Sequence, residues 1–525
     1  MDRGRAVWWQ SAVIYQIYPR SFQDSNGDGV GDLAGIVRRL DYLAWLGIDA
    51  IWLSPIYPSP MADFGYDVAD FTGIDPLFGS LADFDALVAG AHRRGIRVVL
   101  DYVPNHSSDR HPWFQEARSS RRAGKRDWYI WRDPGPDGGP PNNWLSEFGG
   151  PAWTFDPGTG QYYLHSYLKE QPDLNWRNPA LKAAMEDVLH FWLDRGVDGF
   201  RLDALHHVIK DELFRDNPAN PNFRPGMAPH QVLERLYTVD RPEVHKVIAD
   251  LRRIVDGYGE RVLIGEIHLP LAQLMRYYGV GGQGLQLPFN FSLLKASSWT
   301  PASLKPLIAA YEAALPAGAW PNWVLGNHDS PRVASRLGPS LARLAAMLLL
   351  TLRGTPTIYY GDEIGMENVA IPPDRVQDPF EKNVPGLGLG RDPGRTPMRW
   401  SAEPRAGFTT GSPWLPIGEN LAACNVEAEA GDPGSMLSLY RRLIALRKEQ
   451  PALRLGSYSG IDTDPRCLGF LREAEGDRLL VLLNFSDSAC RIPQKGRLLL
   501  STETARPLAE IDELRPGEGI VLQLA

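Results

Sequence analysis

The sequence predicts a (β/α)8 barrel with an inserted subdomain after its third strand and an antiparallel β domain at its carboxyl end. Counted from Val13, eight short apolar runs alternate with amphipathic stretches. A long segment rich in Gly, Pro, Asn and Trp interrupts this alternation once, and short strands separated by turn residues follow Pro451. We therefore expect a barrel over residues 1–103 and 177–450, an inserted subdomain over 104–176, and a C-terminal β-sandwich domain over 451–525.

The first part of the barrel reads β-α-β-α-β. Apolar runs predict strands at 12–18, 50–53 and 96–100, and amphipathic patterns predict helices at 33–46 and 81–94. The irregular stretch that follows is too long to be a simple connection, so we interpret it as an insertion.

The alternation resumes at residue 179 and continues to residue 450. We expect helices at 179–195, 242–257, 301–314, 340–352 and 436–450, and strands at 197–200, 261–265, 287–290, 322–326 and 355–360.

Composition excludes several classes of partner. The 525 residues carry a formal charge of −8, and the sequence contains no run of Lys and Arg suited to phosphates, so we expect an uncharged small-molecule substrate and no nucleic acid. The amino terminus lacks a signal-peptide pattern, and no apolar stretch reaches the length of a membrane span. The three cysteines form no disulfide framework, and we expect a cytoplasmic protein without a membrane partner.

Three acidic residues follow buried strands of the predicted barrel: Asp203, Glu266 and Asp329. The carboxyl ends of barrel strands form the active-site face. Arg201 lies two residues before Asp203, on the same side of an extended chain, and can keep that carboxylate ionised. Three charged acids at one mouth would repel, so one of them must have a raised pKa or be shielded. An ionised nucleophile beside a protonated acid is what a retaining glycosidase requires.

Five motifs give the chain a resemblance to the α-amylase family of glycoside hydrolases, and within it to α-glucosidases of the oligo-1,6-glucosidase and maltase type. They occur in the order typical of the family and extend over most of the barrel: Asp101-Tyr-Val-Pro-Asn-His106, Gln171-Pro-Asp-Leu-Asn175, Gly199-Phe-Arg-Leu-Asp203, Gly265-Glu266 and Asn327-His-Asp329. The resemblance implies that Asp203 is the nucleophile, Glu266 the acid/base and Asp329 the residue that stabilises the transition state. It also implies that His106, Arg201 and His328 line the sugar site.

Two further motifs extend the resemblance, Asp63-Phe-Gly-Tyr66 and Gly390-Arg-Asp-Pro-Gly-Arg-Thr-Pro-Met398. The resemblance implies that Asp63 and Arg395 form a charged pair that closes the far end of the pocket, and that Tyr66 stacks on glucose. Such a pocket admits only a chain end, so we expect release of glucose from non-reducing ends. Phe148 in the insertion is a candidate pocket wall, with surface or core packing as the alternative.

The loop Asp24-Ser-Asn-Gly-Asp-Gly-Val-Gly-Asp32 offers oxygen ligands at alternating positions, like the first nine positions of a calcium loop. It lacks the final bidentate Glu, since the twelfth position is Gly35. The family resemblance implies a structural Ca²⁺ or Mg²⁺ held by Asp24, Asn26, Asp28, Asp32 and the Val30 carbonyl, and no organic cofactor. A metal-free turn is the alternative.

Ala204 follows the predicted nucleophile. In the family, a valine at this position accompanies α-1,6 cleavage and smaller residues accompany α-1,4 preference, so the resemblance implies a partial preference for maltose over isomaltose. Two alternatives remain. The same glucosyl-enzyme serves transglucosidases and sucrose or maltose isomerases, in which a sugar intercepts it instead of water. A non-catalytic relative that uses the fold for binding needs a membrane helix and tolerates loss of the acids, whereas this sequence shows no such helix and keeps all three acids.

Overall fold

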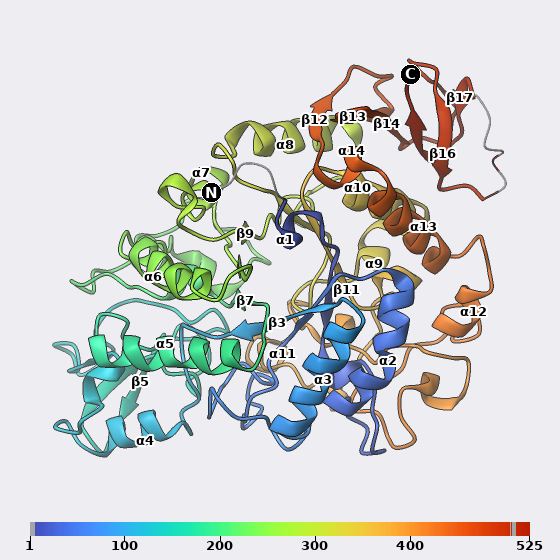
Figure 1. The fold of residues 1–525 in the computed structure, drawn as a ribbon. Helices are drawn as coiled ribbons and strands as arrows, with labels where there is room; N and C mark the ends of the chain where they lie inside the picture. Colours follow the sequence, from blue (N-terminus) through green and yellow to red (C-terminus); the bar gives the residue numbers. More distant parts are fainter. Residues whose placement is uncertain (1–5, 505, 507–510) are drawn as a thin grey trace.

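The barrel is described by a computed structural model covering residues 6–504, 506 and 511–525 (Figure 1). Eight parallel strands form one sheet in the order β10-β11-β1-β2-β3-β7-β8-β9. A parallel bridge between Asn290 and Trp323 joins the two edges, and the Asn290 N–H donates to the Asn322 carbonyl at 2.9 Å. This contact nearly closes the sheet, as the sequence predicts. The strands are β1 (Ile14–Ile17), β2 (Ala50–Leu53), β3 (Arg97–Tyr102), β7 (Gly199–Leu202), β8 (Val262–Gly265), β9 (Leu287–Pro288), β10 (Asn322–Val324) and β11 (Thr355–Tyr359).

A helix follows each barrel strand and covers the outside of the sheet (Figure 1). The sequence pattern did not predict α7, which at six residues is too short to show helical periodicity. The covering helices are α2 (Leu33–Leu46), α3 (Leu81–Arg93), α5 (Pro179–Asp194), α6 (Val244–Asp256), α7 (Leu271–Arg276), α8 (Pro301–Ala314), α10 (Pro339–Thr351) and α13 (Met436–Glu449), and shorter helices are α1 (Trp8–Ser11), α9 (Val333–Leu337), α11 (Pro379–Asn383) and α12 (Val426–Ala430).

Helix α2 shows how local sequence sets these elements. The Asp32 carboxylate caps its first turn by accepting the Gly35 N–H, and Gly47 ends it with φ of 96°. Its apolar residues recur every three or four positions and are buried in the core: Leu33, Ile36, Leu40, Leu43 and Leu46.

The segment between β3 and α5 forms the insertion. It contains α4 (Pro112–Ser119) and a three-stranded antiparallel sheet of β4 (Trp131–Arg132), β6 (Gln161–Leu164) and β5 (Trp153–Asp156), in that spatial order. Aromatic rings fill its interior, with Phe114 stacked on Trp131 at 5.6 Å between centroids.

The chain ends in a separate antiparallel sheet of order β12-β13-β14-β18-β16, together with the ribbon β15-β17. The strands expected after Pro451 are present, and a short helix that was not predicted, α14 (Pro451–Leu455), precedes them, with proline at the favoured first helical position. The strands are β12 (Ser457–Gly460), β13 (Cys467–Ala474), β14 (Asp477–Asn484), β15 (Cys490–Arg491), β16 (Arg497–Ser501), β17 (Glu513–Leu514) and β18 (Gly519–Gln523).

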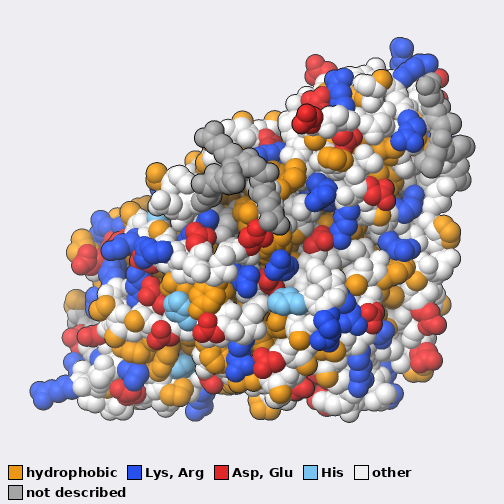
Figure 2. Space-filling view, in the orientation of Figure 1, with side chains coloured by type: hydrophobic (Ala, Val, Ile, Leu, Met, Phe, Trp, Pro, Cys, Tyr) orange, Lys and Arg blue, Asp and Glu red, His pale blue; other side chains and the backbone are white. Residues whose placement is uncertain are grey.

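Charged side chains of both signs are interspersed on the face shown in Figure 2. Such mixing agrees with the net charge of −8 and offers no long basic stripe on the described part of this face. Within the described residues, no helix is both long and apolar enough to cross a bilayer.

Candidate active site

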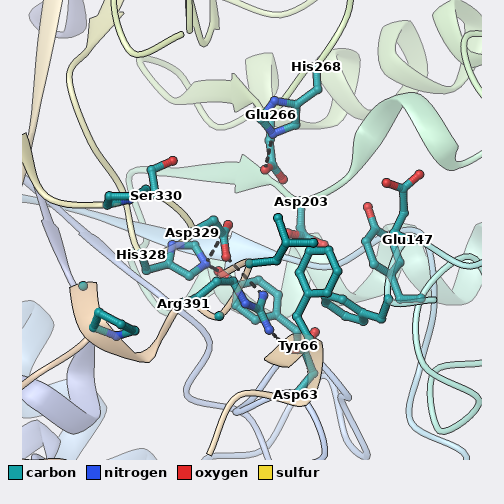
Figure 3. A pocket seen from close by; sticks show the side chains of 18 of the residues that line it. Asp63, Tyr66, Glu147, Asp203, Glu266, His268, His328, Asp329, Ser330 and Arg391 are labelled. Carbon is teal, nitrogen blue, oxygen red and sulfur yellow. Dashed lines mark hydrogen bonds and ion pairs between the residues drawn. The ribbon is translucent and has the colours of Figure 1, made fainter. Parts of the chain in front are cut away.

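A cavity of about 480 Å³ opens at the carboxyl ends of the barrel strands (Figure 3). The structure places eight of the predicted site residues in its lining: Asp63, Tyr66, His106, Phe148, Asp203, Glu266, His328 and Asp329. Arg201, Ala204 and Arg395 are buried and reach the cavity through bonds to lining residues.

Arg201 organises the acidic end of the site. Its side chain is 1% exposed and contacts three carboxylates at once. One nitrogen, Nη1, lies 2.6 Å from Asp101 and 2.9 Å from Asp203, and Nη2 lies 2.7 Å from Glu266. Because Arg201 belongs to β7, the strand itself sets the position of the cation between Asp203 and Glu266. The two carboxyls predicted to be nucleophile and acid/base therefore share one guanidinium.

The pKa values of Asp203 and Glu266 are shifted in opposite directions. Burial raises the pKa of Asp203 well above its usual value; Arg201 opposes this rise, and repulsion from Glu266 and Asp101 adds to it. Burial also raises the pKa of Glu266, but Arg201 and His268 outweigh burial, so its pKa lies well below the usual value. The two shifts therefore run in opposite directions, and the ionised Asp203 and protonated Glu266 that the family resemblance implied stay a prediction. The physical reason is that the second guanidinium nitrogen and His268 both bind Glu266.

His328 and Tyr66 form a rigid wall beside Asp329. Their rings stack at 5.3 Å with an interplanar angle of 3°, and the Tyr66 hydroxyl lies 2.7 Å from His328 Nε2. The Gln16 amide donates to His328 Nδ1 at 2.8 Å, which assigns the ring proton to Nε2. Burial lowers the pKa of His328 to about 3, so the ring is neutral at neutral pH.

Asp329 is held ionised at the cavity surface. Burial raises its pKa, but His328, Arg391 and Arg395 outweigh burial, and the net pKa lies below the usual value. Arg395 Nη2 lies 2.9 Å and Arg391 Nη1 3.2 Å from Asp329 Oδ1.

The predicted ion pair between Asp63 and Arg395 was wrong. Asp63 Oδ1 instead contacts Arg391 Nη2 at 2.8 Å, while Arg395 bonds Asp329 and donates to the His328 carbonyl at 2.7 Å. Arg391 lies four residues before Arg395 in the motif 390–398. The motif therefore identified the correct segment, but not which of its two arginines pairs with Asp63. The turn Asp392–Gly394 separates the two arginines and directs them to different acids.

Phe148 lies in the cavity wall and is 5% exposed. The Arg391 guanidinium lies 4.9 Å from its ring centroid, and Phe380 packs edge-on at 5.2 Å. An aromatic ring from the insertion therefore packs against the Asp63–Arg391 pair and narrows the pocket.

Ala204 is buried in a left-handed conformation with φ of 46°. Its N–H donates to Glu266 Oε2 at 3.0 Å, so this backbone conformation helps to hold the carboxylate. The residue contacts the active site through its backbone, whereas the sequence interpretation concerned its side chain.

Sequence reasoning missed several residues that line the cavity, among them Glu147, His230, His268 and Arg391. His268 follows Glu266 by two positions and binds its Oε1 at 2.9 Å. Glu147 and His230 come from irregular segments without periodicity, and no pattern in the sequence marks them as neighbours of the barrel mouth.

The predicted metal loop is closed by its own hydrogen bonds. The Ser25 N–H donates to Asp32 Oδ2 at 2.9 Å, Asp24 Oδ1 accepts the Asn26 and Gly27 N–H groups, and Asp28 Oδ1 accepts the Val30 N–H. All the candidate metal-ligand atoms are oxygens, which Ca²⁺ and Mg²⁺ prefer, so the residues fit a hard cation. Within the described residues, no group of three or more Asp, Glu, His or Cys side chains forms a metal cluster, and the site depends on the Asn26 and Val30 oxygens as well.

Comparison with known proteins agrees with this geometry. The catalytic-domain model of the alpha-amylase family matches residues 16–456. The chain belongs to the alpha-amylase family. Its curated relatives are named as glycoside hydrolases, and the matched region includes every residue of the cavity lining.

Similar proteins within the alpha-amylase family carry the names of different enzymes. A probable alpha-glucosidase of Rhizobium meliloti (strain 1021) is 44% identical over 93% of this chain and 91% of its own length. The trehalose-6-phosphate hydrolase of Escherichia coli (strain K12) is 41% identical over 91% of each chain. The solved structure of the alpha-glucosyl transfer enzyme XgtA superposes with a TM-score of 0.93 at 41% identity, covering 99% of this chain and 100% of that one.

Proposed function

We propose that this protein is a retaining, exo-acting α-glucosidase that releases glucose from the non-reducing ends of short α-glucosides. The observation that carries the proposal is that Asp203 and Glu266 share the Arg201 guanidinium in a cavity that Asp329 also lines. One guanidinium keeps two carboxyls close together, and a retaining mechanism requires a separation of roughly 5 to 5.5 Å.

In the first step, Asp203 attacks the anomeric carbon and Glu266 protonates the glycosidic oxygen as its bond to that carbon breaks. This step needs an ionised Asp203 and a protonated Glu266, the division of roles that a retaining mechanism requires. In the second step, water attacks the same carbon, Glu266 accepts the water proton, and the Asp203 ester bond breaks. Asp329 remains ionised and stabilises the positive charge of the transition state.

The exo action follows from the closed end of the pocket. The Asp63–Arg391 pair and the Phe148 ring that packs against it leave room for one terminal sugar. The neutral His328 ring and the Tyr66 hydroxyl offer hydrogen bonds to its hydroxyls. We propose maltose and short malto-oligosaccharides as preferred substrates, because Ala204 has the small side chain that the family associates with α-1,4 cleavage.

Transfer of glucose to a second sugar is the competing proposal, and the likeness to XgtA favours it. It uses the same covalent intermediate and differs in the acceptor of the second step. Products formed at high maltose concentration distinguish the two, since transfer yields new linkages and hydrolysis yields glucose alone.

A structural Ca²⁺ or Mg²⁺ in the loop 24–32 is part of the proposal, held by Asp24, Asn26, Asp28, Asp32 and the Val30 carbonyl. The ion would supply stability to the loop and takes no part in the steps above. We also propose a reducing, cytoplasmic setting, supported by the unpaired thiols of Cys424, Cys467 and Cys490.

The direct test is proton NMR of the glucose first released from a maltotriose whose reducing end is blocked. The α-anomer appearing first supports retention, and free glucose as the initial product supports exo action. A β-anomer at early times contradicts the retaining mechanism, and rapid loss of chain length with little glucose contradicts the exo mode.

A further inference from the structure

Glu147 forms a charge cluster with three cationic or ionisable side chains on one wall of the cavity. Its Oε1 lies 2.7 Å from Arg235 Nη1 and 3.8 Å from His207 Nε2, and its Oε2 lies 3.0 Å from His230 Nε2. We call these four residues the Glu147 cluster. Glu147 comes from the insertion, whereas the other three follow β7, so the cluster joins two loops that are far apart in sequence.

Glu147 is a fixed anion. Burial raises its pKa, but Arg235 and His230 outweigh burial, so the pKa lies below its usual value. Both ring nitrogens of His230 face oxygens of Glu147, since Nδ1 lies 3.0 Å from its backbone carbonyl. These two contacts hold the His230 ring against Glu147. The Glu147 N–H in turn donates to the Ser166 carbonyl at 2.9 Å, which fixes the backbone.

Side-chain contacts connect the cluster with Glu266, the residue that acts on the leaving group in the proposed mechanism. Glu266 protonates that group, and His268, which binds Glu266, also lines the cavity. Ring contacts connect the two regions: His268 lies 6.0 Å from His206, which lies 4.5 Å from His207 of the cluster. In Figure 3, Glu147 lies on one side of Asp203 and the His328–Asp329 pair on the other.

Without Glu147, this wall would present cations to the leaving group. Arg235 would offer charged N–H donors and His230 its ring nitrogens, and Lys295 Nζ lies 3.1 Å from His268 Nδ1 nearby. Arginine and lysine side chains in such a pocket bind phosphate or carboxylate. Glu147 occupies these donors and places a negative charge on the cavity surface, since it lines the cavity itself.

We propose that Glu147 determines the charge of the leaving group: it admits uncharged, hydroxylated aglycones and excludes phosphorylated or carboxylated ones. The inference rests on the proposed glucosidase activity and adds the chemical class of its substrates. Lone pairs of Glu147 beyond those used by Arg235 and His230 accept sugar hydroxyls.

The test compares two aryl α-glucosides of nearly equal size, one with a 4-carboxyphenyl and one with a 4-carbamoylphenyl leaving group. We expect the wild-type protein to favour the neutral carbamoyl compound in kcat/KM. In Glu147→Gln, which keeps the shape and removes the charge, this preference should fall by at least about tenfold, because like charges cost several kcal/mol at close range. The ratio of kcat/KM for the two compounds is compared between variants. The intrinsic difference in reactivity of the two leaving groups is the same in every variant and therefore cancels.

Two further variants keep the test decisive. Arg235→Gln removes the positive charge that partly neutralises the Glu147 carboxylate, so the preference for the neutral compound should rise. Glu170→Gln is the matched control, because Glu170 belongs to the same insertion and its carboxylate lies 3.9 Å from Lys169; the ratio should not change.

An unchanged ratio in a folded Glu147→Gln protein overturns the inference. If that variant does not fold, equal wild-type rates on both compounds, or an unchanged ratio in Arg235→Gln, overturn it as well. Failure of the proposed function has a different signature, since neither compound would then release glucose from any variant.

Discussion

Arg391 and Asp63, separated by 328 residues in the sequence, form an ion pair of 2.8 Å that closes one end of the catalytic cavity. Arg391 also contacts Asp378 at 2.6 Å and Asp329 at 3.2 Å. Its side chain is 11% exposed, and the Phe148 ring lies against the guanidinium. One arginine thus connects Asp63, the Phe148 ring of the insertion and Asp329, the residue proposed to stabilise the transition state.

Replacing Arg391 with Ala should therefore reduce kcat/KM on maltose by about 100-fold or more, since removing one partner of a buried charge pair costs roughly 3–5 kcal/mol. Arg391→Lys should retain an intermediate activity, because a point charge cannot bind several acids as a guanidinium does. Arg375→Ala is the matched control, as Arg375 lies in the same irregular region and is in no ion pair within the described structure. Activity of Arg391→Ala equal to that of the control would show that the pair is not needed.

The division of labour between Asp203 and Glu266 predicts distinct kinetic losses. Asp203→Asn should lose at least about 10³-fold in kcat on all α-glucosides, since no glucosyl-enzyme can form. Glu266→Gln should lose about 10²- to 10⁴-fold on maltose but much less on 4-nitrophenyl α-glucoside, whose leaving group needs no proton. Steady-state kinetics on both substrates measure the difference. Equal losses of Glu266→Gln on the two substrates would refute its role as the acid.

Asp362 predicts a pH dependence of stability. It is buried after β11, and burial raises its pKa to about 7, against the effect of Arg332. In the unfolded chain the carboxyl loses its proton near pH 4, whereas the folded protein keeps it to about pH 7. The unfolded state therefore binds fewer protons in this window, and the free energy of unfolding falls as the pH rises from about 4 to about 7.

Asp362→Asn should flatten this fall by up to about 4 kcal/mol, measured by urea unfolding at several pH values. Asp187→Asn, at an exposed position of α5, is the control. Its free energy of unfolding should depend on pH as that of the wild-type protein does. If Asp362→Asn and wild type show the same slope, the buried carboxyl does not carry the proton.

Chelation tests the loop 24–32. If the loop binds Ca²⁺ or Mg²⁺, free ion at 100 times Kd stabilises the protein by about 2.7 kcal/mol, so EDTA should lower the Tm and metal analysis should find one ion per chain. Asp28→Asn should lower the ion content without abolishing activity, because the proposed ion has no catalytic role. A protein without bound metal, whose Tm is insensitive to EDTA, would leave the loop as a hydrogen-bonded turn.

Ala204→Val tests both linkage preference and backbone strain. The family association predicts a higher ratio of isomaltose to maltose cleavage. The left-handed φ of 46° adds a cost, because a β-branched side chain in this region is disfavoured by about 1–2 kcal/mol. We therefore expect a lower free energy of unfolding in Ala204→Val than in Ala204→Gly. A Val variant as stable as wild type with an unchanged linkage ratio would contradict both expectations.

The order of strands and helices could be predicted because it depends on local periodicity. The helix at Pro301–Ala314 has the predicted bounds, and most other barrel elements agree with prediction to within a few residues. The acids Asp203, Glu266 and Asp329 could be found because each follows an apolar run, and parallel strands bring their carboxyl ends to one face.

The sequence by itself thus determined the barrel, the insertion, the C-terminal sheet and the segments that carry the acids. Only the tertiary structure decided that Arg391 rather than Arg395 meets Asp63, that Glu147 joins His230 and Arg235, and that one guanidinium contacts both Asp203 and Glu266. The physical reason is that periodicity is encoded within a few residues, whereas ion-pair partners and pKa values depend on the path of irregular loops and on burial, which bring together side chains hundreds of positions apart.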